Sequence, residues 1–306
     1  MPGCRVRGPG EYVAFGIQEV APGRRKSRHG RNGDEFLGTT DVVTLEVRFA
    51  RSRMIDIHTH VLPGLDDGAR TLEQGFEMLK LAAANGTTDL VATPHSNAEF
   101  RFDEKRIEEA FQSLSALSAG IINLYRGCDC HLNLHNLEDT LVHPTKYTVN
   151  RSRYLLVELP DFLGPSVVWE QLKALLNSRI VPIITHPERN VSLQSSVKRL
   201  KEWVRGGCLV QVTGQSFLGR FGPLAKRSVE SLMDADIVHF VASDAHDCTD
   251  RPPDLSKAHE HVCFRWGKAR ARSLFIDNPA AVISDEPIVS ERQPKRWLPF
   301  FSFSRK

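Results

Sequence analysis

The sequence predicts an α/β fold, a barrel of parallel strands covered by helices, with a polar site at the carboxyl ends of the strands. Short apolar segments alternate with stretches of helical periodicity from residue 54 onward. The apolar segments are continuous rather than alternating, which is typical of parallel strands that are buried on both faces. Histidine and carboxylate side chains stand where these segments end, and in barrels of this class the site lies at that rim.

About seven strands can be counted. They are predicted at residues 54–57, 90–93, 121–125, 154–159, 181–185, 208–212 and 237–242. Helical spacing of apolar residues predicts helices near 72–83, 103–114, 167–176, 197–204 and 224–233. Asp103 is placed to cap the second helix, and Gly86 is a stop signal after the first.

Residues 1–53 differ from the rest of the chain in composition. They hold 8 of the 21 glycines, an Arg-rich run at 24–31 and no sustained periodicity, which predicts disorder. Because Met54 opens directly into the first strand, a non-native extension is the alternative. This segment carries 10 Lys/Arg against 6 Asp/Glu, whereas residues 54–306 carry 30 against 31. The charge of the body therefore excludes a nucleic-acid binder.

The remaining composition predicts a cytoplasmic protein with reduced thiols. No apolar run approaches the roughly 20 residues that span a bilayer, and the start lacks the apolar core of a secretory signal. The six cysteines show no Cys-x-x-Cys spacing. Residues 54–284 form the predicted domain. The tail at 285–306 mixes aromatic and basic side chains, which suits peripheral contact with a membrane surface about as well as packing against the body.

Side chains suited to metal binding stand at the strand ends. His58 and His60 flank Thr59 at the end of the first strand, and residues i and i+2 of a strand point to the same side. Three more predicted strands are followed by histidine, or by aspartate and histidine, and two further carboxylates stand at comparable positions. The candidate ligands are His58, His60, His95, Asp129, Glu158, His186, Asp244 and His246. Mixed imidazole and carboxylate donors suit divalent cations, and carboxylates bridge two ions, so two or three ions are expected.

Two arginines lie close to these residues in the sequence. Arg189 follows His186 by three positions, and Arg251 follows His246 by five. A guanidinium binds a phosphoryl group through two parallel hydrogen bonds, so arginines beside a metal site favour a phosphate substrate over plain surface ion pairs. Asp66 and Asp67 follow the histidine pair, and either is placed to cap the next helix.

These motifs together carry a family resemblance. Met-Ile-Asp-Ile-His-Thr-His is followed in order by Asp-Asp-Gly, Thr-Pro-His, Val-Glu-Leu, Thr-His-Pro-Glu-Arg, Leu-Gly-Arg-Phe-Gly, Ala-Ser-Asp-Ala-His and Arg-Pro-Pro. The set resembles the polymerase and histidinol phosphatase (PHP) superfamily. More closely, it is similar to the manganese-dependent tyrosine-protein phosphatases encoded with bacterial capsule and exopolysaccharide genes. The resemblance covers residues 54–284 and leaves 1–53 outside.

The resemblance implies a distorted (β/α)7 barrel of PHP type that holds two or three Mn²⁺ ions, with Fe, Co or Zn as alternatives. It implies that the eight candidates are metal ligands, that Arg189 and Arg251 bind phosphate, and that Asp67 donates a proton or stands behind the ligands. The implied substrate is phosphotyrosine on a bacterial tyrosine kinase that controls polysaccharide synthesis. The family usually has Glu where this chain has Asp129, a shorter carboxylate that puts one metal position in doubt. Phe100 and Phe102 are placed either to flank the substrate's ring or to pack in the core.

Other functions remain in competition. Histidinol-phosphate phosphatase is the alternative enzyme with the same kind of barrel. An amidohydrolase would carry a bridging lysine where this chain has Glu158. Cysteine-dependent phosphatases need an arginine six residues after the nucleophile, and none of the six cysteines has one. A non-enzymatic interaction module stabilised by metal is a third alternative. It would be expected to lack some of the metal ligands, and almost none of them are missing from this sequence.

Overall fold

The computed structural model describes residues 53–161 and 164–288. The expectations for residues 1–52, and for the tail from residue 289 onward, lie outside the described residues. Within the described ranges no helix is long and apolar enough to cross a membrane.

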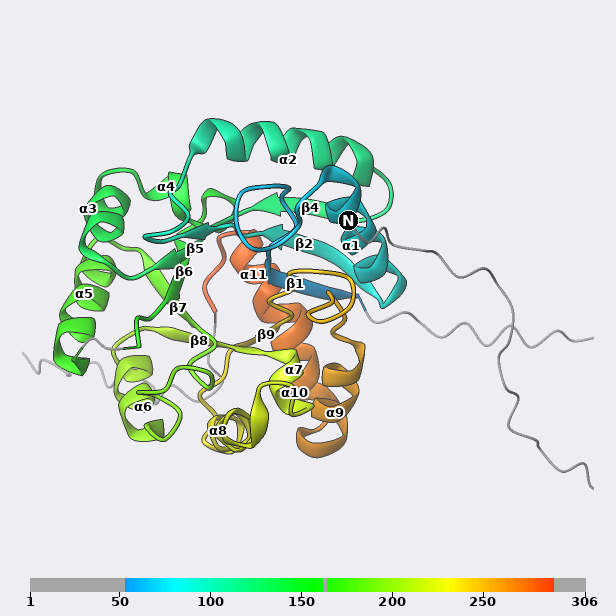
Figure 1. The fold of residues 1–306 in the computed structure, drawn as a ribbon. Helices are drawn as coiled ribbons and strands as arrows, with labels where there is room; N and C mark the ends of the chain where they lie inside the picture. The colour runs from blue at the N-terminus through cyan, green and yellow to red at the C-terminus, as the bar shows by residue number, and fades with distance from the viewer. Residues whose placement is uncertain (1–52, 162–163, 289–306) are drawn as a thin grey trace, which may run out of the picture. The chain divides into compact units, whose positions relative to one another are not determined.

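The strands run parallel to their neighbours in two sheets (Figure 1). One sheet has the order β1 (Met54–Thr59), β2 (Thr87–Ala92) and β4 (Asn123–Arg126). The other has the order β3 (His95–Ser96), β5 (Asp129–His131), β6 (Tyr154–Glu158), β7 (Val181–Thr185), β8 (Leu209–Thr213) and β9 (Phe240–Ala242). The predicted α/β class with parallel strands is therefore confirmed.

Hydrogen bonds connect the two sheets. β3 begins three residues after β2 ends, and β5 three residues after β4. Between these pairs the ladder continues, because Gly127 N donates to Ala92 O at 2.9 Å. On the other side β1 lies beside the segment that follows β9, where His60 N donates to Ala245 O at 2.8 Å. The carboxyl ends of the strands in both sheets consequently meet in one region.

Helices lie around the outside of the strands in the view of Figure 1. They are α1 (Leu72–Ala84), α2 (Glu104–Ser118), α3 (Leu134–Val142), α4 (Pro144–Tyr147), α5 (Pro165–Asn177), α6 (Val197–Arg205), α7 (Gly214–Phe217), α8 (Gly222–Asp234), α9 (Ser256–Trp266), α10 (Lys268–Arg272) and α11 (Asn278–Ile283), with the short turns η1 (Val149–Arg151) and η2 (Ser273–Asp277). All six residues of β1 are buried, including Asp56 and His58, so neither side of this strand faces solvent.

The helix caps agree in part with the sequence. Asp103 caps α2 as predicted, because its Oδ1 accepts a hydrogen bond from Arg106 N at 3.1 Å. The cap of α1 is Thr71 rather than Asp66 or Asp67, so that expectation was wrong. The α1 helix begins later than the aspartates, which leaves both carboxylates free to turn toward the strand ends. The sequence analysis also did not predict α3, although Leu134, Leu137 and Leu141 recur there at helical spacing, or the helices from α9 to α11.

Candidate metal centre

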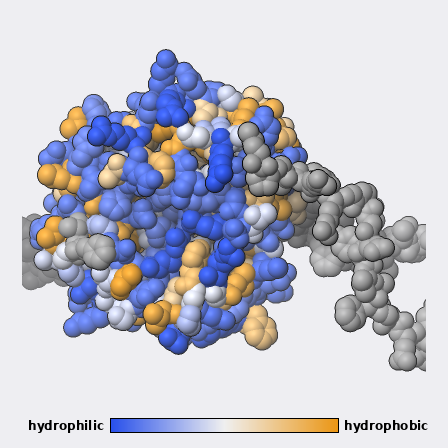
Figure 2. Space-filling model, viewed as in Figure 1, coloured by the Kyte–Doolittle hydropathy of each residue, from blue (hydrophilic) through white to orange (hydrophobic). Residues whose placement is uncertain are grey.

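Each strand end contributes a side chain to one polar cluster. The side chains come from β1 and the residue after it (His58, His60), the starts of β3 and β5 (His95, Asp129), the end of β6 (Glu158), and the residues after β7 and β9 (His186, Asp244, His246). The structure thus brings together all eight residues expected from the sequence. Figure 2 shows the face drawn in Figure 1, where hydrophilic residues gather around a hollow near the middle.

The two histidines of the opening motif aim the same ring atom at the cluster. Their Nε2 atoms lie 3.2 Å apart, and both side chains are buried. On the far side of each ring, His58 Nδ1 donates to Gln211 Oε1 at 3.0 Å and His60 Nδ1 donates to Asp66 Oδ2 at 2.7 Å. A hydrogen bond at one ring nitrogen fixes the tautomer, so that the other nitrogen has a lone pair with which to bind a metal.

Asp129 carries a buried oxygen without a hydrogen-bond partner among the described residues. Its Oδ2 is buried, 3.1 Å from His95 Nδ1 and 3.5 Å from His58 Nε2. Among the described residues neither Asp129 Oδ2 nor His95 Nδ1 has a hydrogen-bond partner. Buried polar atoms are almost always satisfied, and a divalent cation would bind both atoms. The shorter side chain at this position therefore still reaches the cluster.

Three overlapping groups of ligand atoms can be drawn, each with its atoms within 4.8 Å of one another. They are His60, Asp67, His95 and His246; His58, His60 and Asp129; and His95, Asp129 and Glu158. Three residues belong to two groups each, as expected where neighbouring ions share ligands. The donors, imidazole and carboxylate, fit a divalent metal centre.

Asp66 and Asp67 have separate surroundings. Burial alone would raise the pKa of Asp66, but the charge and hydrogen bond of His60 and two backbone amides hold it well below its usual value. Asp67 accepts from His246, and this bond, outweighing partial burial, lowers the pKa of Asp67 to about 2. Asp67 Oδ1 lies 3.4 Å from His246 Nε2 and 3.5 Å from His95 Nε2. Asp66 therefore stands behind the cluster, and Asp67 lies within it.

Glu158 lies close to two other carboxylates of the cluster, those of Asp129 and Asp244. Burial, followed by the charge of Asp129, raises the pKa of Glu158 to about 7. Glu158 Oε1 lies 3.8 Å from His186 Nε2. Several acidic groups in one buried place repel one another, and this is the electrostatic environment that a divalent cation stabilises.

Two of the cluster residues have unusual backbone conformations. His186 has a φ of 32° and Asp244 a φ of 52°, both in the left-handed region. Residues without a glycine's freedom adopt this region at a cost on the order of 1–3 kcal/mol, which is typical of functional sites. The sharp turn after β7 and β9 directs both side chains back over the strand ends.

Both predicted arginines meet at the cluster. Arg189 and Arg251 each donate a hydrogen bond to Asp244 Oδ2, and the bond from Arg251 Nη2 is 2.5 Å long. Their side chains are only 24% and 22% exposed, which is low for surface ion pairs. A phosphoryl group at the metal cluster would therefore lie within reach of two guanidinium groups.

Sequence reasoning missed several supporting residues. Gln211 binds His58 from β8, where its spacing gives no signal. Glu188 is fully buried and accepts from Thr213 N at 2.9 Å and Ser216 Oγ at 2.7 Å, so it fixes the segments after β7 and β8 to each other. Asp56 accepts from Ser243 N at 3.0 Å and ties β1 to the end of β9.

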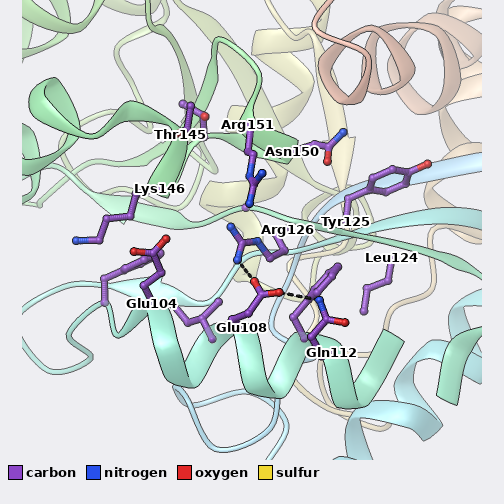
Figure 3. Close-up of a pocket in the computed structure, with 15 residues that line it drawn as sticks. Glu104, Glu108, Gln112, Leu124, Tyr125, Arg126, Thr145, Lys146, Asn150 and Arg151 are labelled. Atoms are coloured by element: carbon purple, nitrogen blue, oxygen red, sulfur yellow. Dashed lines mark hydrogen bonds and ion pairs between the residues drawn. The ribbon is translucent and has the colours of Figure 1, made fainter. Parts of the chain in front are cut away.

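Phe100 and Phe102 have different environments. The Phe100 ring lies parallel to that of His95, with centroids 6.2 Å apart. Phe102 packs on Tyr147 at 4.5 Å and lines a separate hollow of about 270 Å³ between α2 and residues 144–151. In that hollow Glu108 binds Arg126 and Gln112 (Figure 3), and none of the cluster residues lines it. Phe102 is thus a packing residue, and Phe100 lies beside the cluster.

Comparison with known proteins gives consistent matches. A family model described as "Capsular polysaccharide synthesis, CpsB/CapC" matches residues 54–284. A Staphylococcus aureus protein named "Putative tyrosine-protein phosphatase CapC" is 34% identical over 256 residues, 80% of this chain and 99% of the relative. The Streptococcus pneumoniae "Tyrosine-protein phosphatase CpsB" is 30% identical over 244 residues, 77% of this chain and 100% of the relative.

Solved structures give the same result. A structure from work on YwqE from Bacillus subtilis and CpsB from Streptococcus pneumoniae, described as unique metal-dependent tyrosine phosphatases, superposes with a TM-score of 0.72. The identity is 27%, with 77% of this chain and 96% of the other covered. A lactonase from Listeria monocytogenes, at a TM-score of 0.51 and 12% identity, is similar in fold alone.

Proposed function

Because the chain belongs to the CpsB/CapC family of capsular polysaccharide synthesis, we propose that it is a metal-dependent phosphatase that hydrolyses phosphotyrosine in proteins. One observation carries the proposal: the overlapping ligand groups adjoin two half-buried arginines, which converge on Asp244. Metal ions and arginines side by side suit a phosphoryl group better than an uncharged substrate.

We propose further that the strands form the distorted (β/α)7 barrel of PHP type. In this arrangement β2 and β3 are one interrupted strand, and β4 and β5 another. The hydrogen bond from Gly127 to Ala92 and that from His60 to Ala245 support a closed ring of strands.

The proposed ligands are His58, His60, His95, Asp129, Glu158, His186, Asp244 and His246. We add Asp67 to this set, as an alternative to the proton-donor role, since its Oδ1 lies 3.4 Å from His246 Nε2 and 3.5 Å from His95 Nε2 within one of the three ligand groups. Mn²⁺ is the proposed ion, with Fe, Co or Zn as alternatives that accept the same donors.

The chemistry follows from the residues in place. A divalent cation bound here supplies Lewis-acid polarisation of the phosphoryl oxygens and makes water more acidic. Arg189 and Arg251 bind the equatorial oxygens and offset the charge that develops on them. Their contacts with Asp244 hold both guanidinium groups beside the cluster before substrate arrives. Cys128, next to Asp129, is poorly suited to act as a nucleophile, because it is buried and burial raises the pKa of its thiol.

The proposed physiological substrate is a bacterial tyrosine kinase that controls polysaccharide synthesis, and the proposed location is the cytoplasm. Among the described residues the thiols of Cys128, Cys130, Cys208 and Cys263 form no disulfide, which supports a reducing compartment. Contact of the C-terminal tail with a membrane stays a prediction: deleting residues 294–306 should reduce sedimentation with anionic vesicles and leave activity on a small substrate unchanged.

Initial rates on three substrates test the function. With Mn²⁺ present, we expect faster hydrolysis of a phosphotyrosine peptide than of a phosphoserine peptide or histidinol phosphate. Asp244→Ala should lose bound metal and nearly all activity, and a thiol-alkylating reagent should leave the wild-type rate unchanged. A clear preference for histidinol phosphate would assign the alternative function, and full activity of a metal-depleted variant would refute metal dependence.

A further inference from the structure

The segment from Leu218 to Phe221, which joins α7 to α8, has no role in the function described so far. Two glycines adopt the left-handed region here, Gly219 within the segment with a φ of 83° and Gly222 at the start of α8 with a φ of 86°. Glycine accepts this conformation without strain, so the chain can turn sharply on both sides of Phe221.

The Phe221 ring lies against both arginines of the candidate site. The guanidinium carbon of Arg189 is 4.3 Å from the ring centroid, and that of Arg251 is 6.0 Å away. Both distances are within the range of about 6 Å at which the negative face of an aromatic ring attracts a cation. One ring therefore contacts two cations that come from separate segments, after β7 and after β9.

Two like charges in one place need more than the carboxylate that they share. Arg189 and Arg251 both donate to Asp244 Oδ2, and the carboxylates of Glu188 and Glu158 add negative charge near Arg189. The aromatic face supplies additional electrostatic attraction for both guanidinium groups.

A second contact ties the segment to the loop that carries Arg251. Arg220, the neighbour of Phe221, donates from Nη2 to Asp250 Oδ1 at 3.0 Å. Both side chains are well exposed, so this pair contributes little to stability by itself. It does link the position of the ring to the position of the second arginine.

We propose that Phe221 is a positioning residue that holds Arg189 and Arg251 side by side as one phosphate-binding unit. This inference rests on the proposed function, because it assigns phosphate as the ligand of the two arginines. When a phosphoryl group draws the guanidinium groups away from Asp244, the ring keeps their planes in place.

Variants of Phe221 separate positioning from general stability. In the Mn²⁺-loaded protein, Phe221→Leu should lower kcat/KM on a phosphotyrosine peptide about tenfold and weaken binding of inorganic phosphate, measured by calorimetry, by a similar factor. Bound metal should not change. Phe221→Tyr, which keeps an aromatic face, should restore both values to within about threefold of wild type. Phe264→Leu is the matched control, because Phe264 is 93% exposed on α9.

A double-mutant cycle tests the contact itself. In an Arg251→Lys background, Phe221→Leu should lower kcat/KM by a clearly smaller factor than in wild type, because the contact between the ring and the second guanidinium group is already lost. Equal costs in the two backgrounds, or a Tyr variant as defective as the Leu variant, would overturn the proposal. If wild type binds phosphate through these residues but does not hydrolyse phosphotyrosine, the proposed function fails and the positioning role stands.

Discussion

Replacing Gly68 by alanine should displace His60 and damage the metal centre although no proposed ligand is substituted. A Cβ at this position would lie 2.1 Å from His60 O and 2.5 Å from His60 Cβ. Gly68 N also donates to Asp66 Oδ1 at 3.0 Å, so the loop cannot move without Asp66, which holds the His60 ring. Relief of the clash needs a shift on the order of 1 Å, and a misplacement of this size costs about 100-fold in rate.

The assay compares Gly68→Ala with Gly164→Ala. An added Cβ at Gly164 meets nothing within 4 Å, and its φ is −60°, so alanine fits there. We expect Gly68→Ala to lower metal content and to reduce kcat on phosphotyrosine about 100-fold, with about 1–3 kcal/mol lost from the free energy of unfolding. The control should match wild type in all three measurements. Wild-type metal content and kcat in Gly68→Ala would refute the reasoning.

Other changes have separate signatures. Asp66→Asn should weaken metal affinity about 10- to 100-fold in a competition titration, because the amide orients His60 less well; affinity equal to wild type would contradict this. Arg189→Lys and Arg251→Lys should each keep the metal but lower kcat/KM about tenfold or more, since lysine lacks the two-bond fork; unchanged kinetics would make both arginines structural. Burial, more than the charge of Arg270, lowers the pKa of His239 to about 4. Between about pH 6.5 and pH 4, His239 is protonated in the unfolded state but neutral in the folded state. The contribution of His239 to the free energy of unfolding is therefore complete above about pH 6.5 and is lost toward pH 4, on the order of 3 kcal/mol in all. Denaturant titrations across that window should show a shallower fall in His239→Gln, and equal falls would exclude His239 as the cause.

Local signals were sufficient for the class of fold and for most elements. The strand Val181–Thr185 has the bounds that its apolar run predicts, and Asp103 caps its helix because capping depends on neighbouring residues alone. The strand predicted from residue 237 begins only at Phe240. An apolar run shows which residues are buried but not which of them pair with a neighbouring strand.

The chain by itself determined the candidate ligands and the family, because the period of a strand and the position of histidines at strand ends are local properties. Only the tertiary structure decided which residues support them. It placed Asp66 behind His60, put Asp67 within the cluster, and brought Phe221 against two arginines from other segments. These contacts join residues with no fixed spacing in the sequence. They arise from how the strand ends meet, which depends on the packing of the whole domain.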